Sequence, residues 1–257
     1  MMVSQGTVVV TGATRGIGRA TVDAILERGG KVVAIARDER LLAALQGSAP
    51  NRIRALGADL EHLDRIPDLA NRANDAFGSV DGLVNCAGIA RYEPVGAIGL
   101  DSVEAQLRVN LVAPLLLSQA LAVHFRVPGG SIVNVSSTLS ERAAPHTVVY
   151  AATKAALNAV TKGLALELAP AGVRVNAVLP GGVETDMLRT PRLRPGETLD
   201  PGEIEARVAS QLAGLAALHP LGRLGTPQEV ASVIIGVLDQ TWQTGSLVTI
   251  DGGLSLA

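Results

Sequence analysis

Short runs of β-branched and aliphatic residues alternate along this chain with longer segments of helical periodicity. This alternation constrains the fold most, because strands separated by helices pair in parallel and carry the helices on both faces of the sheet. Seven runs have the length and composition of buried strands, at 7–11, 31–36, 55–60, 81–85, 131–136, 173–178 and 247–250. Helical patterns cover 19–28, 38–46, 63–77, 101–123 and 150–169. We therefore expect an α/β fold built on a doubly wound, seven-stranded parallel sheet.

The length of the chain suits one domain of this class. Its 257 residues contain no linker, internal repeat or low-complexity segment, so we expect a single domain over 1–257. Hydrophobic residues make up 47% of the chain and charged residues 18%, which allows a large core and argues against disorder. Aromatic residues make up only 2%, so the core must be aliphatic.

The charge balance argues against two classes of partner. The 22 basic and 24 acidic residues give a net charge of −2, so there is no basic surplus for nucleic acid or a membrane surface. The apolar segment 111–123 is too short to span a bilayer and is interrupted by Pro114. The N-terminus lacks the pattern of a signal peptide, and the single Cys86 fits a reducing compartment. We expect a cytoplasmic protein.

A glycine-rich turn follows the first expected strand and opens the first helix. Gly12, Gly16 and Gly18 have the spacing G-x-x-x-G-x-G, which lets the backbone approach a pyrophosphate at the positive end of the helix. A lone glycine triplet is a weak signal, but its place between strand and helix makes it a good one. The sequence thus predicts a Rossmann-type sheet that binds a dinucleotide.

The end of the second expected strand selects the cofactor. An acidic residue there binds the ribose 2′-hydroxyl, whereas a basic residue accommodates a 2′-phosphate. Here Ala36 is followed by Arg37, and Arg15 in the glycine turn could reach the same phosphate. These residues favour NADP(H) over NAD(H), although Asp38 could bind the hydroxyl after a small shift of the backbone.

Tyr150 and Lys154 are four residues apart on an expected helix, so they share one face. A nearby ammonium lowers the pKa of a phenol, and a phenol tuned in this way can give or take a proton. By itself such a pair is more often an ordinary surface feature. Its significance depends on the motifs around it.

One region lacks periodicity. Residues 187–202 (MLRTPRLRPGETLDPG) are rich in Arg, Pro and Gly, and so long a loop in a compact domain is usually functional or mobile. We interpret this region as part of a substrate lid over 187–215, in preference to a surface insertion. Arg189, Arg192 and Arg194 could meet an anionic substrate or a carrier protein, but a solvated face is the preferred interpretation.

Further motifs follow the glycine turn in order. They are 11–18 (TGATRGIG), Asp59-Leu60, 85–88 (NCAG), 109–111 (VNL), Ser136-Ser137, Tyr150 with Lys154, 180–185 (PGGVET) and 251–253 (DGG). With these motifs the chain resembles the single-domain branch of the short-chain dehydrogenase/reductases from end to end. Cys86 is a departure, because the family usually has a second Asn there. We expect Cys86 to pack in the core without a redox role.

The resemblance implies a catalytic tetrad of Asn110, Ser137, Tyr150 and Lys154. Tyr150 would be the general acid in reduction and the base in oxidation, and Ser137 would hydrogen-bond the substrate oxygen as charge develops. Lys154 would bind the nicotinamide ribose and lower the pKa of Tyr150, and Asn110 would hold a water for proton relay. Ser137 is preferred to Ser136 because it lies thirteen residues before Tyr150, as in the family.

The resemblance also implies the cofactor-binding positions, and no metal. They are Gly12, Thr14, Arg15, Gly16, Ile17, Gly18, Arg37, Asp59, Leu60, Asn85, Ala87, Gly88, Tyr150, Lys154, Pro180, Gly181, Val183 and Thr185. The substrate pocket would be lined by 138–146, 91–94 and 187–202, where His146 could touch the substrate but is more often a loop residue.

Within the family the chain looks most like the NADPH-dependent carbonyl and L-xylulose reductases and the 3-oxoacyl-carrier-protein reductases. The expected function is NADP(H)-dependent interconversion of a ketone and a secondary alcohol. The alternatives are an NAD-dependent secondary alcohol dehydrogenase, a 3-oxoacyl-carrier-protein reductase and, from another class, a non-catalytic NADP(H)-binding sensor. The family also implies a homotetramer with surfaces at 101–123, 150–169 and 247–257.

Overall fold

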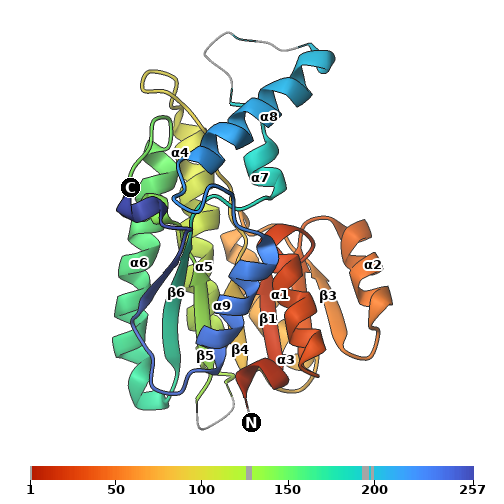
Figure 1. Cartoon of the computed structure of the whole chain (residues 1–257). Helices are drawn as coiled ribbons and strands as arrows, with labels where there is room; N and C mark the ends of the chain where they lie inside the picture. Colours follow the sequence, from red (N-terminus) through yellow and green to blue (C-terminus); the bar gives the residue numbers. More distant parts are fainter. Residues whose placement is uncertain (1, 126–128, 193–196, 198–199) are drawn as a thin grey trace.

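Seven parallel strands form one sheet in the part of the chain that the computed structural model describes, residues 2–125, 129–192, 197 and 200–257 (Figure 1). The strands are β1 (Thr7–Thr11), β2 (Lys31–Ala36), β3 (Ile53–Gly57), β4 (Gly82–Asn85), β5 (Ser131–Val135), β6 (Arg174–Pro180) and β7 (Leu247–Ile250). The predicted fold class is therefore confirmed.

The strand order β3-β2-β1-β4-β5-β6-β7 places the point of reversal between β1 and β4. The chain runs from β1 outward to β3 and then returns to the other side of β1. Val10 accordingly pairs with Ala34 of β2 on one side and with Val84 of β4 on the other. In open α/β sheets the crevice at such a reversal, outside the carboxyl ends of the strands, is where ligands bind.

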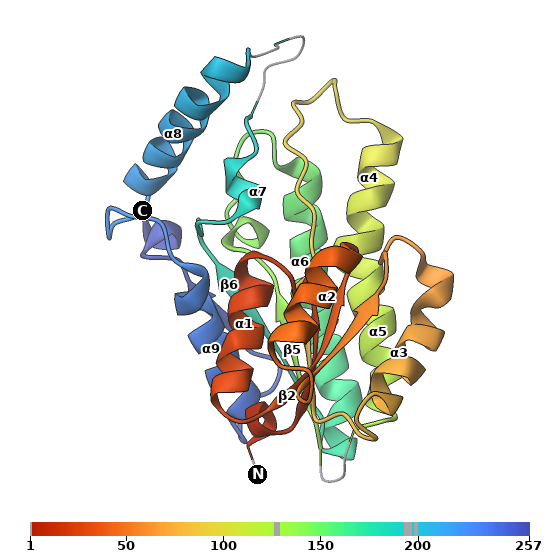
Figure 2. The same ribbon diagram turned by 90° about the vertical axis from the view of Figure 1, so that its right-hand side faces the viewer.

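Helices cover both faces of the sheet (Figures 1 and 2). One face carries α1 (Gly16–Glu27), α2 (Glu39–Ser48) and α9 (Pro227–Asp239), and the other carries α3 (Ile66–Asp75), α5 (Ala113–Ala122) and α6 (Val148–Leu168). The remaining α-helices of the described residues are α4 (Leu100–Leu107), α7 (Asp186–Arg189) and α8 (Pro201–Ala217). Both views show α7 and α8 projecting beyond one end of the sheet.

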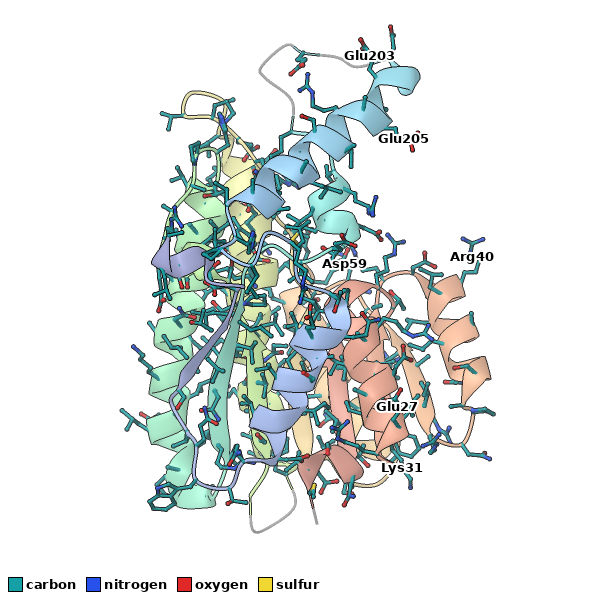
Figure 3. The ribbon with its side chains drawn as sticks, in the orientation of Figure 1. Glu27, Lys31, Arg40, Asp59, Glu203 and Glu205 are labelled. Carbon is teal, nitrogen blue, oxygen red and sulfur yellow. The ribbon has the colours of Figure 1, made fainter. Side chains whose placement is uncertain are left out.

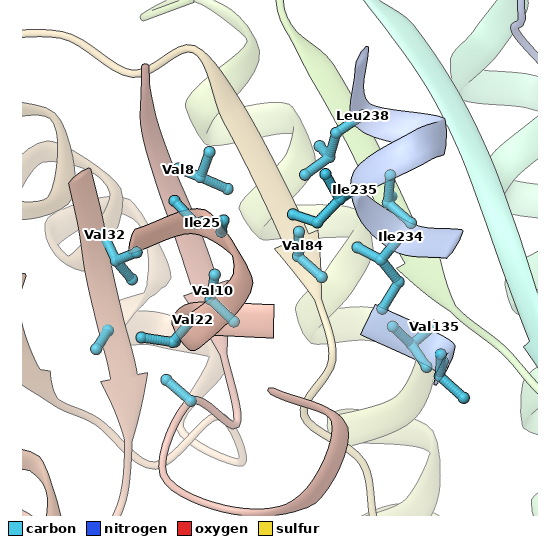
Figure 4. Close-up of a cluster of buried hydrophobic side chains, with 14 of the residues drawn as sticks. Val8, Val10, Val22, Ile25, Val32, Val84, Val135, Ile234, Ile235 and Leu238 are labelled. Carbon is cyan, nitrogen blue, oxygen red and sulfur yellow. The ribbon is translucent and has the colours of Figure 1, made fainter. Parts of the chain in front are cut away.

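Alternation along the strands divides the core into two layers. Val8 and Val10 of β1 face α1 and α9, whereas Val9 between them packs toward α3 and α5. Figure 4 shows Val10 and Val84 beside side chains of α1 and α9. Because every residue of β1 is buried, a continuous β-branched run marks this strand as central.

One predicted strand has different bounds in the structure, and one predicted helix is interrupted. The third strand covers Ile53–Gly57 rather than 55–60, because the apolar Ile53 is buried in the sheet and Gly57 is already exposed. The helix expected over 101–123 consists of α4 and α5 joined by a π-helical turn at Arg108–Val112. Such turns are rare and frequently lie at functional sites.

Three helices were not predicted from the sequence, namely α7, α8 and α9, although α8 and α9 carry start signals. At the start of α9, Thr226 and Glu229 form a capping box, and Pro227 between them occupies the first helical position. Asp200 and Glu203 do the same for α8, which begins inside the region interpreted as a loop. No helix among the described residues combines the length and the apolarity needed to cross a membrane.

Candidate active site

A cavity of about 870 Å³ runs along the carboxyl ends of the central strands, from the glycine turn after β1 to the C-terminal segment. Most of the predicted site residues line it. They are Gly12, Thr14, Arg15, Gly16, Ile17, Gly18, Arg37, Asp59, Leu60, Ala87, Gly88, Ser137, Tyr150, Lys154, Pro180, Gly181, Val183 and Thr185. Asn85 and Asn110 do not line it, and each is described below.

The glycine turn leaves a bare backbone surface. A Cβ at Gly18 would lie 2.2 Å from the carbonyl oxygen of Gly12, so α1 can begin this close to β1 only with glycine there. Gly12 has a positive φ of 67° and packs against the backbone of Ala87. A glycine-rich turn at the N-terminus of a helix lets a pyrophosphate approach the backbone, so the residues present match the predicted dinucleotide.

Charged side chains gather where β2 ends. Arg15 lies 3.5 Å from Asp38 and 3.9 Å from Asp186, and Arg37 lies 4.0 Å from Asp59. Both arginine side chains are more than half exposed, so each can turn toward a ligand. Figure 3 shows Asp59 at this end of the sheet, on the same side as α7 and α8.

Asp38 has a structural task at the start of α2. Its carboxylate accepts a hydrogen bond from the Leu41 backbone nitrogen at 3.0 Å and so caps the helix. This bond, together with the nearby charges of Arg40 and Arg15, lowers the pKa of Asp38. One oxygen of the carboxylate is thus committed to the cap while the other faces Arg15.

Tyr150 lies in the first turn of α6 and is buried in the cavity wall. Burial raises the pKa of its phenol, the Tyr92 phenol raises it further, and a hydrogen bond with Ser137 opposes the rise. The Ser137 oxygen also accepts from the Leu139 backbone nitrogen at 3.1 Å. Ser136 instead donates to the Lys154 carbonyl at 3.2 Å, so Ser137 is the serine that meets Tyr150.

Lys154 is buried one turn along the same helix, with its ammonium nitrogen 5.7 Å from the centre of the Tyr150 ring. The ammonium donates to the Val135 carbonyl at 2.8 Å, at the end of β5. Burial lowers the pKa of Lys154 to about 8. The pKa of Tyr150 is raised overall, because removal of the phenol from water outweighs the effect of its neighbours, and a lowering contribution from Lys154 stays a prediction.

Asn110 occupies the π-helical turn and is fully buried. Its amide nitrogen donates to the Ile89 carbonyl at 2.8 Å and to the Thr153 hydroxyl at 3.2 Å, and its oxygen accepts from the Ile89 nitrogen at 2.9 Å. A Cβ added to Gly88 would lie 3.4 Å from the Asn110 oxygen and 3.5 Å from the Lys154 nitrogen. Asn110 therefore lies behind the cavity wall and fixes the segment that contacts Lys154.

Asn85 points into the protein, whereas Cys86 is partly buried in the cavity wall and packs against the core. The Asn85 amide donates to the Asn134 oxygen at 2.8 Å and to the Ser118 hydroxyl at 3.1 Å, in a buried network between β4, β5 and α5. Burial raises the pKa of the Cys86 thiol to about 12, which disfavours the reactive thiolate. Only the backbone of this segment is held toward the glycine turn, through bonds from the Cys86 and Ala87 nitrogens to Thr11.

The other end of the cavity is mostly aliphatic. Its lining includes Leu139, Leu188, Leu215 and Leu254, together with Tyr92, Arg142 and Arg192. Some of the residues predicted to contact the substrate line this end of the cavity, and others do not. His146 has a φ of 65° and is not among the lining residues, and Arg189 is exposed on α7. Arg194, with most of the stretch 193–199, lies outside the described residues.

His219 is a site residue that the sequence analysis did not identify. It is buried at the end of α8 and lines the cavity. One ring nitrogen accepts a hydrogen bond from the Gly182 nitrogen at 3.0 Å, and the other lies 2.8 Å from the Leu215 carbonyl. His219 thus ties the turn after β6 to α8. A lone histidine outside any periodic pattern gave no signal of this contact.

Comparisons with known proteins agree with the geometry. The profile of the short chain dehydrogenase family matches residues 6–195. An L-xylulose reductase of Mesocricetus auratus is 35% identical, over 95% of this chain and 94% of its own. A 3-oxoacyl-(acyl-carrier-protein) reductase of Aquifex aeolicus is 34% identical, over 96% of each chain.

A solved structure is similar over the whole fold. It is the ligand-free aldohexose dehydrogenase of Thermoplasma acidophilum, which superposes with a TM-score of 0.86 at 28% identity. The match covers 100% of this chain and 97% of that one. The fold of this chain is therefore that of a known dehydrogenase.

Proposed function

Because this chain belongs to the short-chain dehydrogenase family of nicotinamide-dependent oxidoreductases, we propose that it interconverts a ketone and a secondary alcohol with NADP(H). The observation that carries the proposal is that Ser137, Tyr150 and Lys154 converge on the cavity that begins at the glycine turn. A site for proton transfer and a cradle for a dinucleotide thus share one space.

The proposed roles follow from where the side chains lie. Bound NADPH supplies the hydride. Tyr150 holds the proton that passes to the ketone oxygen, and Ser137 donates a hydrogen bond to that oxygen as charge develops. The raised pKa keeps the Tyr150 phenol protonated at neutral pH, so the proton is in place for reduction, and its transfer depends on stabilisation of the phenolate. Lys154 stabilises the phenolate left behind, and Asn110 holds the backbone beside it.

The preference for NADP(H) rests on Arg15 and Arg37. Both line the cavity near the end of β2, where a ribose 2′-phosphate would lie. Asp38, the residue that would instead bind a ribose hydroxyl, caps α2 and pairs with Arg15. A 2′-phosphate would gain two guanidinium partners, whereas a ribose hydroxyl would have to compete for the Asp38 carboxylate.

Titration with NADPH and NADH, followed by fluorescence, tests this preference. We expect tighter binding of NADPH, and a loss of that advantage in Arg37→Asp. Arg28→Asp makes the same change of charge at the far end of α1 and should keep the preference. Tighter binding of NADH by the wild type would make Asp38 the ribose ligand and would favour an NAD-dependent secondary alcohol dehydrogenase.

Substitution of Tyr150 tests the proton transfer. Tyr150→Phe should bind NADPH as before and lose nearly all turnover on a panel of small ketones and diketones. Tyr92→Phe removes the other tyrosine hydroxyl of the chain and should retain turnover. Substantial activity in Tyr150→Phe would remove Tyr150 from the acid role. A wild type that binds NADPH without reducing any ketone would instead support a sensor.

We propose that 187–215 forms a lid over the substrate. Met187, Leu188 and Leu215 from this region line the cavity. Hydrogen exchange in this region should slow when NADPH and a substrate analogue bind, and unchanged exchange would contradict a lid.

We also propose a homotetramer in a reducing, cytoplasmic environment. Leu107 on α4, Leu166 on α6 and Leu256 near the C-terminus expose apolar side chains, on surfaces where the family forms its interfaces. The single thiol of Cys86 has no need of an oxidising compartment. A monomer in light scattering would contradict the tetramer.

A further inference from the structure

The charges that line the cavity are divided unevenly between its two ends. Its lining carboxylates are Asp38, Asp59 and Asp186, and each lies within 4.0 Å of Arg15 or Arg37 at the cofactor end. Arg142 and Arg192 line the aliphatic end, where no described lining residue is acidic. The substrate end is therefore cationic.

Of these two arginines, Arg192 has the guanidinium with fewer polar partners among the described residues. Its guanidinium carbon lies 4.1 Å from the centre of the Tyr92 ring, so the planar group rests on an aromatic face. Its Nε is shielded from solvent and has no hydrogen-bond partner, and among the described residues no carboxylate forms an ion pair with it. Arg142, in contrast, donates to the Leu254 carbonyl. A partly buried guanidinium without a counter-charge is costly, and an anionic ligand would supply one.

Gln211 of α8 holds Arg192 in this place. Its side-chain oxygen accepts from the Arg192 backbone nitrogen at 3.0 Å, and its nitrogen donates to the carbonyls of Leu188 and Thr190 at 2.7 and 3.1 Å. Arg207 adds a longer bond to the Arg192 carbonyl. The segment is thus fixed at several points before any substrate arrives, which lowers the entropic cost of binding.

Tyr92 connects Arg192 to the reacting position. The Tyr92 phenol is near enough to Tyr150 to raise its pKa, and the Tyr92 ring lies under Arg192. The loop that carries Tyr92 is held by a bond from the Glu93 nitrogen to the His146 carbonyl at 3.0 Å. A substrate with its ketone at Tyr150 would therefore extend toward Arg192 along aliphatic walls.

We propose that Arg192 binds a carboxylate of the substrate, so that the ketone reduced by this chain is an oxo acid with an aliphatic body. This inference rests on the proposed function. One planar guanidinium matches the two oxygens of a carboxylate. The aliphatic side chains of Leu139, Leu188 and Leu215 would cover the methylene groups between ketone and carboxylate.

Matched pairs of substrates test the proposal. The series 4-oxopentanoate, 5-oxohexanoate and 6-oxoheptanoate would be compared with the methyl ester of each acid, at saturating NADPH. For the best acid, kcat/KM should fall at least about tenfold in Arg192→Met, while its ester changes by less than about twofold. Arg192→Lys should keep part of the preference, because it retains the charge without the fork. Arg189→Met removes an exposed arginine outside the cavity lining and should change neither value.

A binding measurement separates this proposal from the proposed function. Hexanoate and hexanamide would be titrated into the wild type and both methionine variants by calorimetry. Hexanoate should bind more tightly than hexanamide to the wild type and to Arg189→Met, and this difference should vanish in Arg192→Met. That result supports the anion site even if no ketone is reduced. Equal binding of hexanoate by the wild type and Arg192→Met, or an equal loss of acid and ester turnover, would overturn it.

Discussion

The Lys154 ammonium lies 5.7 Å from the centre of the Tyr150 ring, yet it donates its hydrogen bond to the Val135 carbonyl at 2.8 Å. The lysine is thus anchored to the end of β5, and the phenol is anchored to Ser137. Burial dominates the protonation of both groups, since it raises the pKa of Tyr150 and lowers that of Lys154. At neutral pH the phenol is therefore protonated, as the direction of reduction requires.

The low pKa of Lys154 makes stability depend on pH. Burial lowers this pKa from 10.5 to about 8, so between these values the unfolded chain binds more protons than the folded one. Stability contributed by this group therefore rises with pH across that interval. From pH 8 to 9 the free energy of unfolding should rise by up to about 1 kcal/mol relative to Lys154→Met. Urea unfolding of both proteins at each pH measures the difference.

The interval from pH 8 to 9 isolates this effect. Burial raises the pKa of the Cys86 thiol from 9.0 to about 12, so above pH 9 the folded chain binds more protons here and the free energy of unfolding falls as pH rises. The raised pKa of Tyr150 lowers the free energy of unfolding in the same way above pH 10. Lys162→Met removes an exposed lysine of the same helix and should keep the wild-type slope. A wild-type slope in Lys154→Met would show that Lys154 does not titrate in this range.

The parts of the site that depend on local pattern were predictable from the sequence. Gly12 and Gly18 indicate positions where the close approach of two backbone segments leaves no room for a side chain. The four-residue spacing of Tyr150 and Lys154 predicts that they share one face of a helix. The switch between β1 and β4 follows from the alternation of strands and helices, together with the resemblance to a family.

The remaining parts depend on contacts between distant segments. Gln211 reaches Arg192 across 19 residues and His219 reaches Gly182 across 37, and no periodicity records such pairs. The preferred interpretation of Arg192 as a solvated side chain is wrong, because the stack on Tyr92 exists only once the two segments meet at the cavity. The helix α9 is different, since its capping box was present in the sequence and was overlooked.

Gly18 tests the close approach of α1 to β1. In Gly18→Ala the new methyl group would lie 2.2 Å from the Gly12 carbonyl oxygen, so the backbone must shift. We expect a loss of about 1–3 kcal/mol of stability, typical of overpacking, and a weaker affinity for NADPH. Gly236 lies on the exposed face of α9, where an added Cβ would meet no atom outside the helix backbone within 4 Å, so Gly236→Ala should instead stabilise the protein by about 0.5–1 kcal/mol. An unchanged NADPH affinity in Gly18→Ala would contradict a tight cradle.

His219 tests the connection between α8 and the turn after β6. In His219→Leu the Gly182 nitrogen loses its acceptor, which should cost about 1–3 kcal/mol of stability and raise the KM for NADPH. His219→Gln offers a carbonyl oxygen at similar reach and should restore most of both values. If the glutamine variant behaves like the leucine variant, packing of the ring rather than the hydrogen bond is what matters.

Asn110 tests whether the π-helical turn serves the site or only the fold. Its side chain satisfies both backbone groups of Ile89, and Asn110→Ala leaves them without partners. We expect a loss of about 1–3 kcal/mol of stability, together with lower NADPH affinity and lower kcat, because the segment beside Lys154 is released. Unfolding, binding and steady-state measurements on the same preparation would record all three.

Asn176 provides the matched control for Asn110. It is equally buried, and it also bridges a carbonyl and an amide of another segment, donating to Gln243 at 2.8 Å and accepting from Ser246 at 3.0 Å. These contacts lie between β6 and the loop before β7, away from the cavity lining. Asn176→Ala should therefore lose similar stability and keep the wild-type NADPH affinity and kcat at temperatures where it is folded. If Asn110→Ala and Asn176→Ala lose the same activity for the same loss of stability, Asn110 acts on the fold alone. A role beside Lys154 requires that Asn110→Ala lose more activity than Asn176→Ala at equal stability.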